Sequence, residues 1–203
     1  MRILIIFIFL LSFPVSAEDI SDFEIEGISI GDSLIELVSK DQILAQFKIT
    51  SNYYKHLNNP NKFREVYIFS GKDFYNSKEF EIYDDLSFFV KPDDNKYTIH
   101  FIRGLITFNE NLQECFKIKN EIIQDIESII PDYKDKRESS TSAQQDSSGR
   151  SKAYHTVYIL ENDDVFHINC NDWEENLRKK NNWTEGLTVS IYTNEFYQWL
   201  HDF

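Results

Sequence analysis

The feature that most constrains the fold is a helical hydrophobic pattern between Asn111 and Ile130. Apolar side chains recur there at intervals of three and four residues, which places them on one side of an α-helix. The stripe consists of Leu112, Cys115, Phe116, Lys119, Ile122, Ile123, Ile126, Ile129 and Ile130, of which only Lys119 is polar. Asn111 stands three residues before Glu114, as in a helix-capping pair, and Pro131 ends the segment. The pattern predicts a long helix with Cys115 facing the core.

Segments on both sides of this helix have the β-branched and aromatic content of strands. Before it we predict two short helices at residues 34–38 and 40–47, followed by strands at residues 66–69, 80–90 and 97–108. After it we predict a hairpin at residues 154–160 and 165–170, a helix at residues 172–179, a strand at residues 187–192 and a terminal helix capped by Thr193 or Asn194. The expected fold class is therefore α+β, with antiparallel strands that carry helices on one face and with two lobes that meet near Phe108.

The expected division of the chain has three parts. Residues 1–17 form a signal peptide, residues 18–108 an N-terminal α-α-β-β-β lobe, and residues 109–203 a C-terminal lobe. Within the C-terminal lobe, residues 132–152 are rich in Ser, Gln and Lys and contain almost nothing to bury. We predict a flexible loop there, serving either as a binding element or as tolerated surface sequence.

The first residues have the pattern of a secretory leader. Arg2 precedes an apolar run from Ile3 to Phe13, and small side chains at Val15 and Ala17 fit cleavage after Ala17. A retained membrane anchor is the alternative, but the run is shorter than the ~20 residues that span a bilayer. We therefore expect an exported protein, periplasmic or secreted, with no stable membrane anchor after cleavage.

Export would place the two cysteines in an oxidising compartment, where disulfides form. In an oxidising compartment, Cys115 and Cys170 are the only possible intramolecular pair, so a disulfide between them is expected. Two buried free thiols are the alternative. The sequence has neither the C-x-x-C spacing nor the basic surroundings that a redox role requires.

Charge and motifs exclude several functions. The chain has 34 acidic and 21 basic side chains and a formal charge of −13, which would repel nucleic-acid phosphates. Its five histidines form no helical ligand pair, and two of its three Asp-Asp doublets fall in predicted turns. Nucleophile elbows and glycine-rich phosphate loops are missing from the sequence. We expect neither a metal nor another cofactor and assign no catalytic residue.

Two stretches carry a resemblance to a known group. They are residues 23–34, Phe-Glu-Ile-Glu-Gly-Ile-Ser-Ile-Gly-Asp-Ser-Leu, and the pair Glu114-Cys115-Phe116 with Ile168-Asn169-Cys170-Asn171-Asp172-Trp173. The chain resembles a family of uncharacterised exported proteins from small-genome marine bacteria, which implies export and paired cysteines. The order of elements in residues 29–108 is also similar to the α-α-β-β-β modules of outer-membrane assembly lipoproteins and β-lactamase inhibitor proteins. This chain lacks the lipidated cysteine of the lipoproteins.

An excess of aromatic residues marks the last quarter of the chain. Trp173, Trp183, Tyr192 and Tyr197 are candidates for a ligand or partner surface, although such side chains can equally form a core. The leading hypothesis is a non-enzymatic binding or scaffold module that contacts another envelope protein through a sheet edge or a helix surface. The alternative is a periplasmic hydrolase or a small-ligand-binding protein with a cleft at these aromatics.

Overall fold

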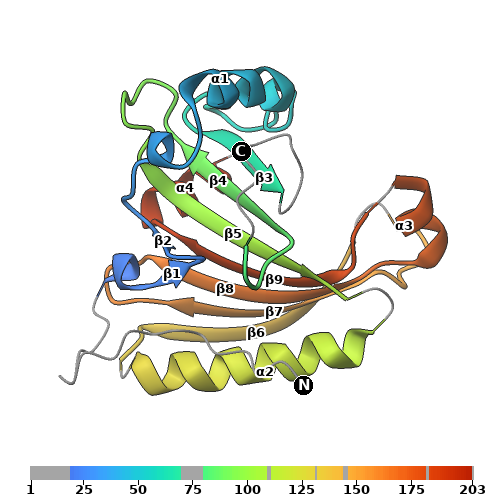
Figure 1. Cartoon of the computed structure of the whole chain (residues 1–203). Coiled ribbons are helices and arrows are strands. Elements are labelled where there is room, and N and C mark those ends of the chain that lie inside the picture. The colour runs from blue at the N-terminus through green and yellow to red at the C-terminus, as the bar shows by residue number, and fades with distance from the viewer. Residues whose placement is uncertain are drawn as a thin grey trace.

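The computed structural model describes residues 19–69, 80–108, 111–130, 132–143, 146–181 and 183–202, so the expected leader at residues 1–17 lies outside the described residues. The α+β class is confirmed (Figure 1). The strands are β1 (Glu24–Ile25), β2 (Ile28–Ser29), β3 (Arg64–Phe69), β4 (Asp85–Val90), β5 (Ile99–Thr107), β6 (Asp135–Ser142), β7 (Lys152–Ile159), β8 (Val165–Asp172) and β9 (Gly186–Tyr192). The helices are α1 (Lys40–Ile49), α2 (Leu112–Ile129), α3 (Glu175–Asn181) and α4 (Asn194–Leu200), with single 3₁₀ turns η1 (Ile20–Asp22), η2 (Leu34–Glu36) and η3 (Thr50–Asn52).

One seven-stranded sheet joins the two halves of the chain. Its order is β3-β4-β5-β9-β8-β7-β6, and every neighbouring pair is antiparallel. The last strand, β9, lies between β5 and β8 and so connects the strands that precede α2 with those that follow it (Figure 1). The division into two lobes near Phe108 is not confirmed, because the sheet and its main core extend across that position.

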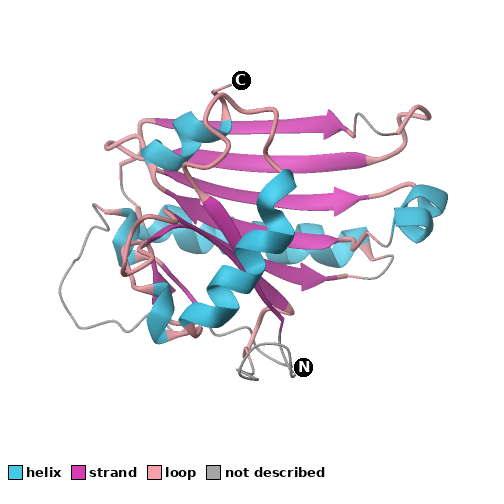
Figure 2. Ribbon diagram, turned by 90° about the horizontal axis from the view of Figure 1, so that it is seen from above, coloured by secondary structure: helices cyan, strands magenta, loops and turns pink. Residues whose placement is uncertain are grey.

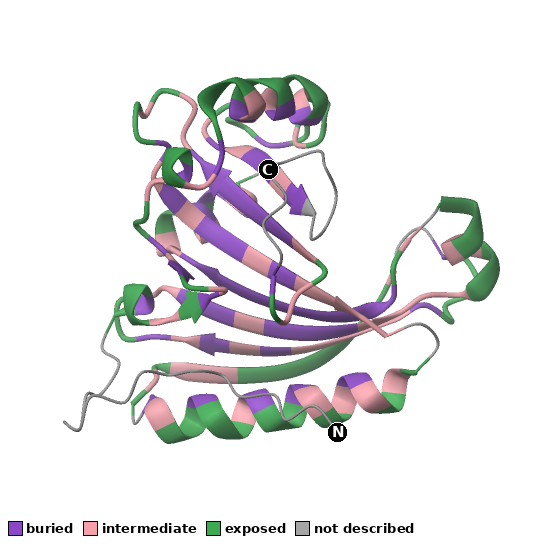
Figure 3. Ribbon diagram, viewed as in Figure 1, coloured by how far each residue is buried: buried purple, intermediate pink, exposed green. Residues whose placement is uncertain are grey.

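The two faces of the sheet carry different cores. Successive side chains of a strand point to opposite faces, and in β4 Phe88 belongs to the main core while Phe89 belongs to a smaller aromatic one. The main core includes the buried sides of α1 and α2, and Figure 3 shows α2 with its buried residues turned toward the sheet. The smaller core contains Phe196 and Trp199 of α4. Helices α1 and α2 therefore share one face as expected, whereas α4 packs on the other.

Helix α2 is fixed at its first turns. The side chain of Asn111 accepts a hydrogen bond from the backbone N–H of Glu114 at 3.2 Å, which confirms the predicted cap. Cys115 forms the expected disulfide with Cys170 of β8, with a Cα–Cα distance of 6.0 Å. Further along, Lys119 donates to the carbonyl of Tyr154 at 2.7 Å, and burial lowers its pKa to about 8. Within the described part of the chain, no helix has the length and apolar composition needed to cross a membrane.

The prediction of a flexible loop at residues 132–152 is wrong. Residues 135–142 form the edge strand β6, which pairs with β7 from Asp135 opposite Ile159 to Ser142 opposite Lys152. Most side chains of β6 are exposed, so backbone hydrogen bonds rather than burial hold the strand, and it leaves no hydrophobic pattern in the sequence.

The predicted strand at residues 80–90 is shorter in the structure, where β4 begins at Asp85. The carboxylate of Glu26 accepts hydrogen bonds from the backbone N–H groups of Glu81, Ile82 and Tyr83, at 2.7 to 3.1 Å. These N–H groups are thereby satisfied without a strand partner. The side chain of Glu26 thus links the β1–β2 turn to the segment that leads into β4.

Candidate functional site

A pocket of about 290 Å³ lies where β5 and β8 end and β9 begins. Its lining combines two apolar side chains and the disulfide with polar and charged groups: Phe108, Leu112, Cys115, Asn171, Asp172, Glu175, Arg178, Glu185 and Gly186. The volume is at the lower end for ligand pockets and suits a single side chain or a small molecule. Helix α3, which supplies Glu175 and Arg178, projects beyond the ends of the strands (Figure 2).

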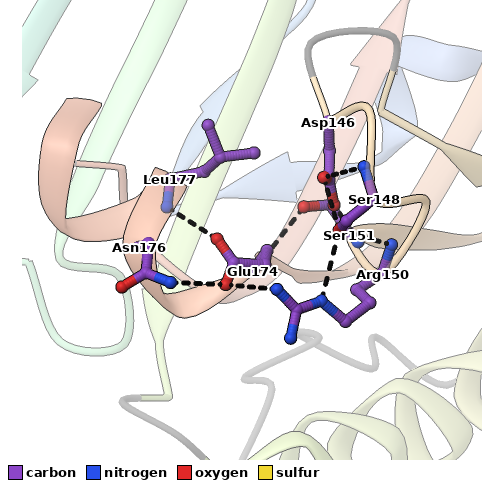
Figure 4. A network of polar contacts seen from close by, with 7 residues as sticks. All are labelled: Asp146, Ser148, Arg150, Ser151, Glu174, Asn176 and Leu177. Atoms are coloured by element: carbon purple, nitrogen blue, oxygen red, sulfur yellow. Dashed lines mark hydrogen bonds and ion pairs between the residues drawn. The ribbon is translucent and has the colours of Figure 1, made fainter.

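A polar network holds α3 in place (Figure 4). Glu174, whose side chain is only 8% exposed, precedes the helix and accepts the backbone N–H of Leu177 at 3.0 Å. Its other carboxylate oxygen accepts from Arg150 at 2.8 Å, and its backbone N–H donates to Ser151 at 2.9 Å. Arg150 and Ser151 belong to the connection between β6 and β7, so this connection positions one wall of the pocket.

The connection itself is organised by a carboxylate. Asp146 accepts hydrogen bonds from the backbone and hydroxyl of Ser148 and from the backbone N–H of Ser151, at 2.6 to 2.8 Å. These bonds hold the pKa of Asp146 well below its usual range. The carboxylate therefore remains ionised at neutral pH and keeps the turn that supports α3.

Two charged residues face each other in the pocket wall. The Nε atom of Arg178 lies 3.6 Å from Oε1 of Glu185, and the two side chains are 16% and 11% exposed. The same carboxylate oxygen accepts the backbone N–H of Trp173 at 3.2 Å. Glu175 is exposed and pairs with Lys179, whose ammonium lowers the pKa of the Glu175 carboxyl. Both carboxylates are thus placed by specific contacts.

The floor of the pocket depends on a glycine. A Cβ atom added to Gly186 would lie 2.1 Å from the carbonyl oxygen of Ile106, a backbone atom of the neighbouring strand. Only glycine therefore permits β9 to begin so close to β5. This close approach brings the ends of β5, β8 and β9 together around the pocket.

Two predicted site residues lie beside this pocket. The rings of Trp173 and Trp183 are 4.8 Å apart and inclined at 50°. The indole N–H of Trp173 donates to the carbonyl of Thr184 at 3.0 Å, and the backbone N–H of Trp183 donates to the carbonyl of Arg178 at 3.0 Å. These bonds tie both tryptophans to segments that line the pocket.

The other two predicted site residues lie elsewhere. Tyr192 ends β9, whereas the pocket surrounds its beginning, roughly 20 Å away for a seven-residue strand. Tyr192 is buried in the aromatic core with Phe101 and Phe196, and its ring stacks on Tyr197 at 6.3 Å. The structure therefore separates the four aromatics into two pairs instead of one cleft. The sequence did not indicate the charged pocket residues, because Asp172, Glu175 and Arg178 fall in the short helix predicted at residues 172–179 and Glu185 falls between predicted elements.

A second polar region crosses the sheet face that carries the aromatic core. Residues directly opposite one another in five strands form a row consisting of Tyr67, Ser87, Arg103, Ser190 and His167. At its end, Nε2 of His167 lies 3.0 Å from Nδ1 of His155, and burial lowers the pKa of His167 to about 3. This histidine is therefore neutral at pH 7. Among the described residues, no group of three His, Cys, Asp or Glu side chains is placed to hold a metal ion.

Comparisons of the chain with protein-family models, with curated proteins and with solved structures gave no match. The fold and the pocket beside α3 are therefore the basis for assigning a function. Among the described residues that line this pocket, none is a serine, histidine, lysine or free thiol. The described lining offers carboxylates, a guanidinium, an amide and apolar side chains as groups for recognition.

Proposed function

We propose that the protein is an exported, non-enzymatic binding module that contacts another protein of the cell envelope through the pocket beside α3. The observation that carries the proposal is the polar pocket, whose lining includes residues of α3. Figure 2 shows that this helix projects beyond the ends of the strands. A projecting wall is accessible to a partner as large as a protein. The sheet and the network around Glu174 hold the pocket ready before binding, which lowers the entropic cost of association.

The residues around the pocket have the composition of a recognition surface. Tryptophan and arginine are enriched among the residues that dominate binding energy at protein interfaces. Here Trp173 and Trp183 lie beside a pocket whose lining includes Arg178. The tryptophans are partly exposed and their backbones are fixed by hydrogen bonds. Contact with a partner therefore costs them little conformational entropy.

Export is supported by the disulfide. Bonds of this kind form and persist in oxidising compartments, and Cys115–Cys170 is buried between α2 and β8. The apolar leader expected at residues 1–17 agrees with this location. The formal charge of −13 favours a neutral or basic protein partner over a nucleic acid.

Site-specific photocrosslinking in cells tests the proposal. A benzophenone amino acid at Lys180, exposed at the end of α3, should capture one protein, to be identified by mass spectrometry. The same probe at Gln124, exposed on α2, is the matched control and should capture none. Capture of the same proteins from both positions, or of no protein from Lys180, would refute a binding site beside α3.

A further inference from the structure

The pocket has an excess of negative charge. Among the described residues that line it, three bear carboxylates (Asp172, Glu175 and Glu185) and one bears a guanidinium (Arg178), which gives this set a formal charge of −2. Glu185 lies 3.6 Å from Arg178, so the cation is already engaged and does not offer itself to an anion. The lining therefore favours a positively charged ligand.

One of these carboxylates is unpaired. Asp172 is half-buried at the end of β8 and has no hydrogen-bond or ion-pair partner for its side chain among the described residues. A partly desolvated carboxylate gains most from a charged donor that replaces the lost water. Asp172 is therefore the natural anchor for a cationic group that enters the pocket.

Apolar groups line the same pocket as this anchor, and an aromatic pair lies beside the pocket. Phe108 and Leu112 line the pocket and suit the methylene stem of a long basic side chain. Trp173 follows Asp172 directly in the chain, and its ring packs against that of Trp183. Indole faces attract cations, and a planar guanidinium stacks on them better than an ammonium does.

We infer that the pocket receives an arginine side chain of the partner protein, with its guanidinium on the carboxylate of Asp172 and beside the Trp173–Trp183 pair. This inference rests on the proposed function and specifies its ligand. The pocket volume of about 290 Å³ accommodates one such side chain. Arginine is preferred to lysine because its fork of donors matches a carboxylate bidentately.

Peptide titration of the disulfide-bonded protein tests the inference. The probe is acetyl-Gly-Arg-Gly-amide, and the reference is the same peptide with citrulline, which has nearly the same shape but no charge. Binding is followed by ¹H–¹⁵N NMR, including the indole N–H signals of Trp173 and Trp183. The arginine peptide should shift these signals saturably and bind at least about tenfold more tightly than the citrulline peptide. Equal affinity for the two peptides would overturn the inference.

Two variants test whether binding of the arginine peptide depends on the pocket. Asp172→Asn should weaken binding of the arginine peptide about tenfold or more, the loss expected for one charge-assisted hydrogen bond. Asp125→Asn removes the same charge from an exposed position on α2 and should leave binding unchanged. Equal effects of the two variants would show general attraction to an acidic protein and would contradict the pocket assignment. If Lys180 crosslinks a partner but the arginine peptide does not bind, the proposed function stands and the arginine inference fails.

Discussion

The contribution of the disulfide to the free energy of unfolding can be calculated from its place in the chain. Cys115 and Cys170 are separated by 55 residues and join the first turns of α2 to the last strand residues before the pocket. In the chain-entropy model, closing a loop of this length stabilises the folded state by about 4 kcal/mol. Cys115→Ser should therefore lower the free energy of unfolding of oxidised protein by about 4 kcal/mol. For a chain of this size, the melting temperature should fall by roughly 8–16 °C.

The assay is urea and thermal unfolding, followed by circular dichroism with and without dithiothreitol. Reduced wild-type protein should match the Cys115→Ser variant to within about 1 kcal/mol, because both lack the bond while the substitution itself is small. The comparison separates loss of the crosslink from the effect of burying a hydroxyl group. An oxidised variant that melts within 2 °C of wild type, a shift below the roughly 8 °C minimum expected, would refute the reasoning.

Three further outcomes are expected. Glu185→Gln removes the carboxylate 3.6 Å from half-buried Arg178 and should cost about 1–3 kcal/mol in urea unfolding, so an unchanged midpoint would argue against the pair. Gly186→Ala places a Cβ atom 2.1 Å from the Ile106 carbonyl oxygen and should destabilise by about 2 kcal/mol or more; a neutral effect would contradict the close approach of β9 to β5. His167 has a folded-state pKa of about 3, below its usual 6.5, so protons bind the unfolded state first and stability falls as pH drops below 6.5. Between pH 6.5 and 5.0, wild type should lose about 2 kcal/mol more than His167→Asn, and parallel losses would exclude this cause.

Local patterns in the sequence predicted most of the elements but not their arrangement. The apolar stripe at residues 112–130 became α2 because one buried side of a long helix leaves a clear period. The position of β9 between β5 and β8 depends on pairing between distant segments, for which the sequence has no local signal. For the same reason, the sequence predicts two lobes, whereas the structure has one sheet that extends across the expected boundary. Strand β6 was missed because its side chains are exposed, so it has no hydrophobic pattern to find.

The candidate site was predictable only in part. The sequence indicates the tryptophans because large aromatic side chains are rare and informative, and Trp173 and Trp183 do lie beside the pocket. Tyr192 was indistinguishable from them in sequence, yet it faces the aromatic core beneath α4. Asp172 gained its candidate role only from the fold, which brings the ends of three strands together and leaves its carboxylate without a partner among the described residues.

The most direct test of the central claim is a crystal structure of the disulfide-bonded protein with saturating acetyl-Gly-Arg-Gly-amide. Our account predicts that the guanidinium lies in the pocket beside α3, within hydrogen-bonding distance of the Asp172 carboxylate and against the Trp173–Trp183 pair. A peptide bound elsewhere on the surface, or an empty pocket at saturation, would contradict it.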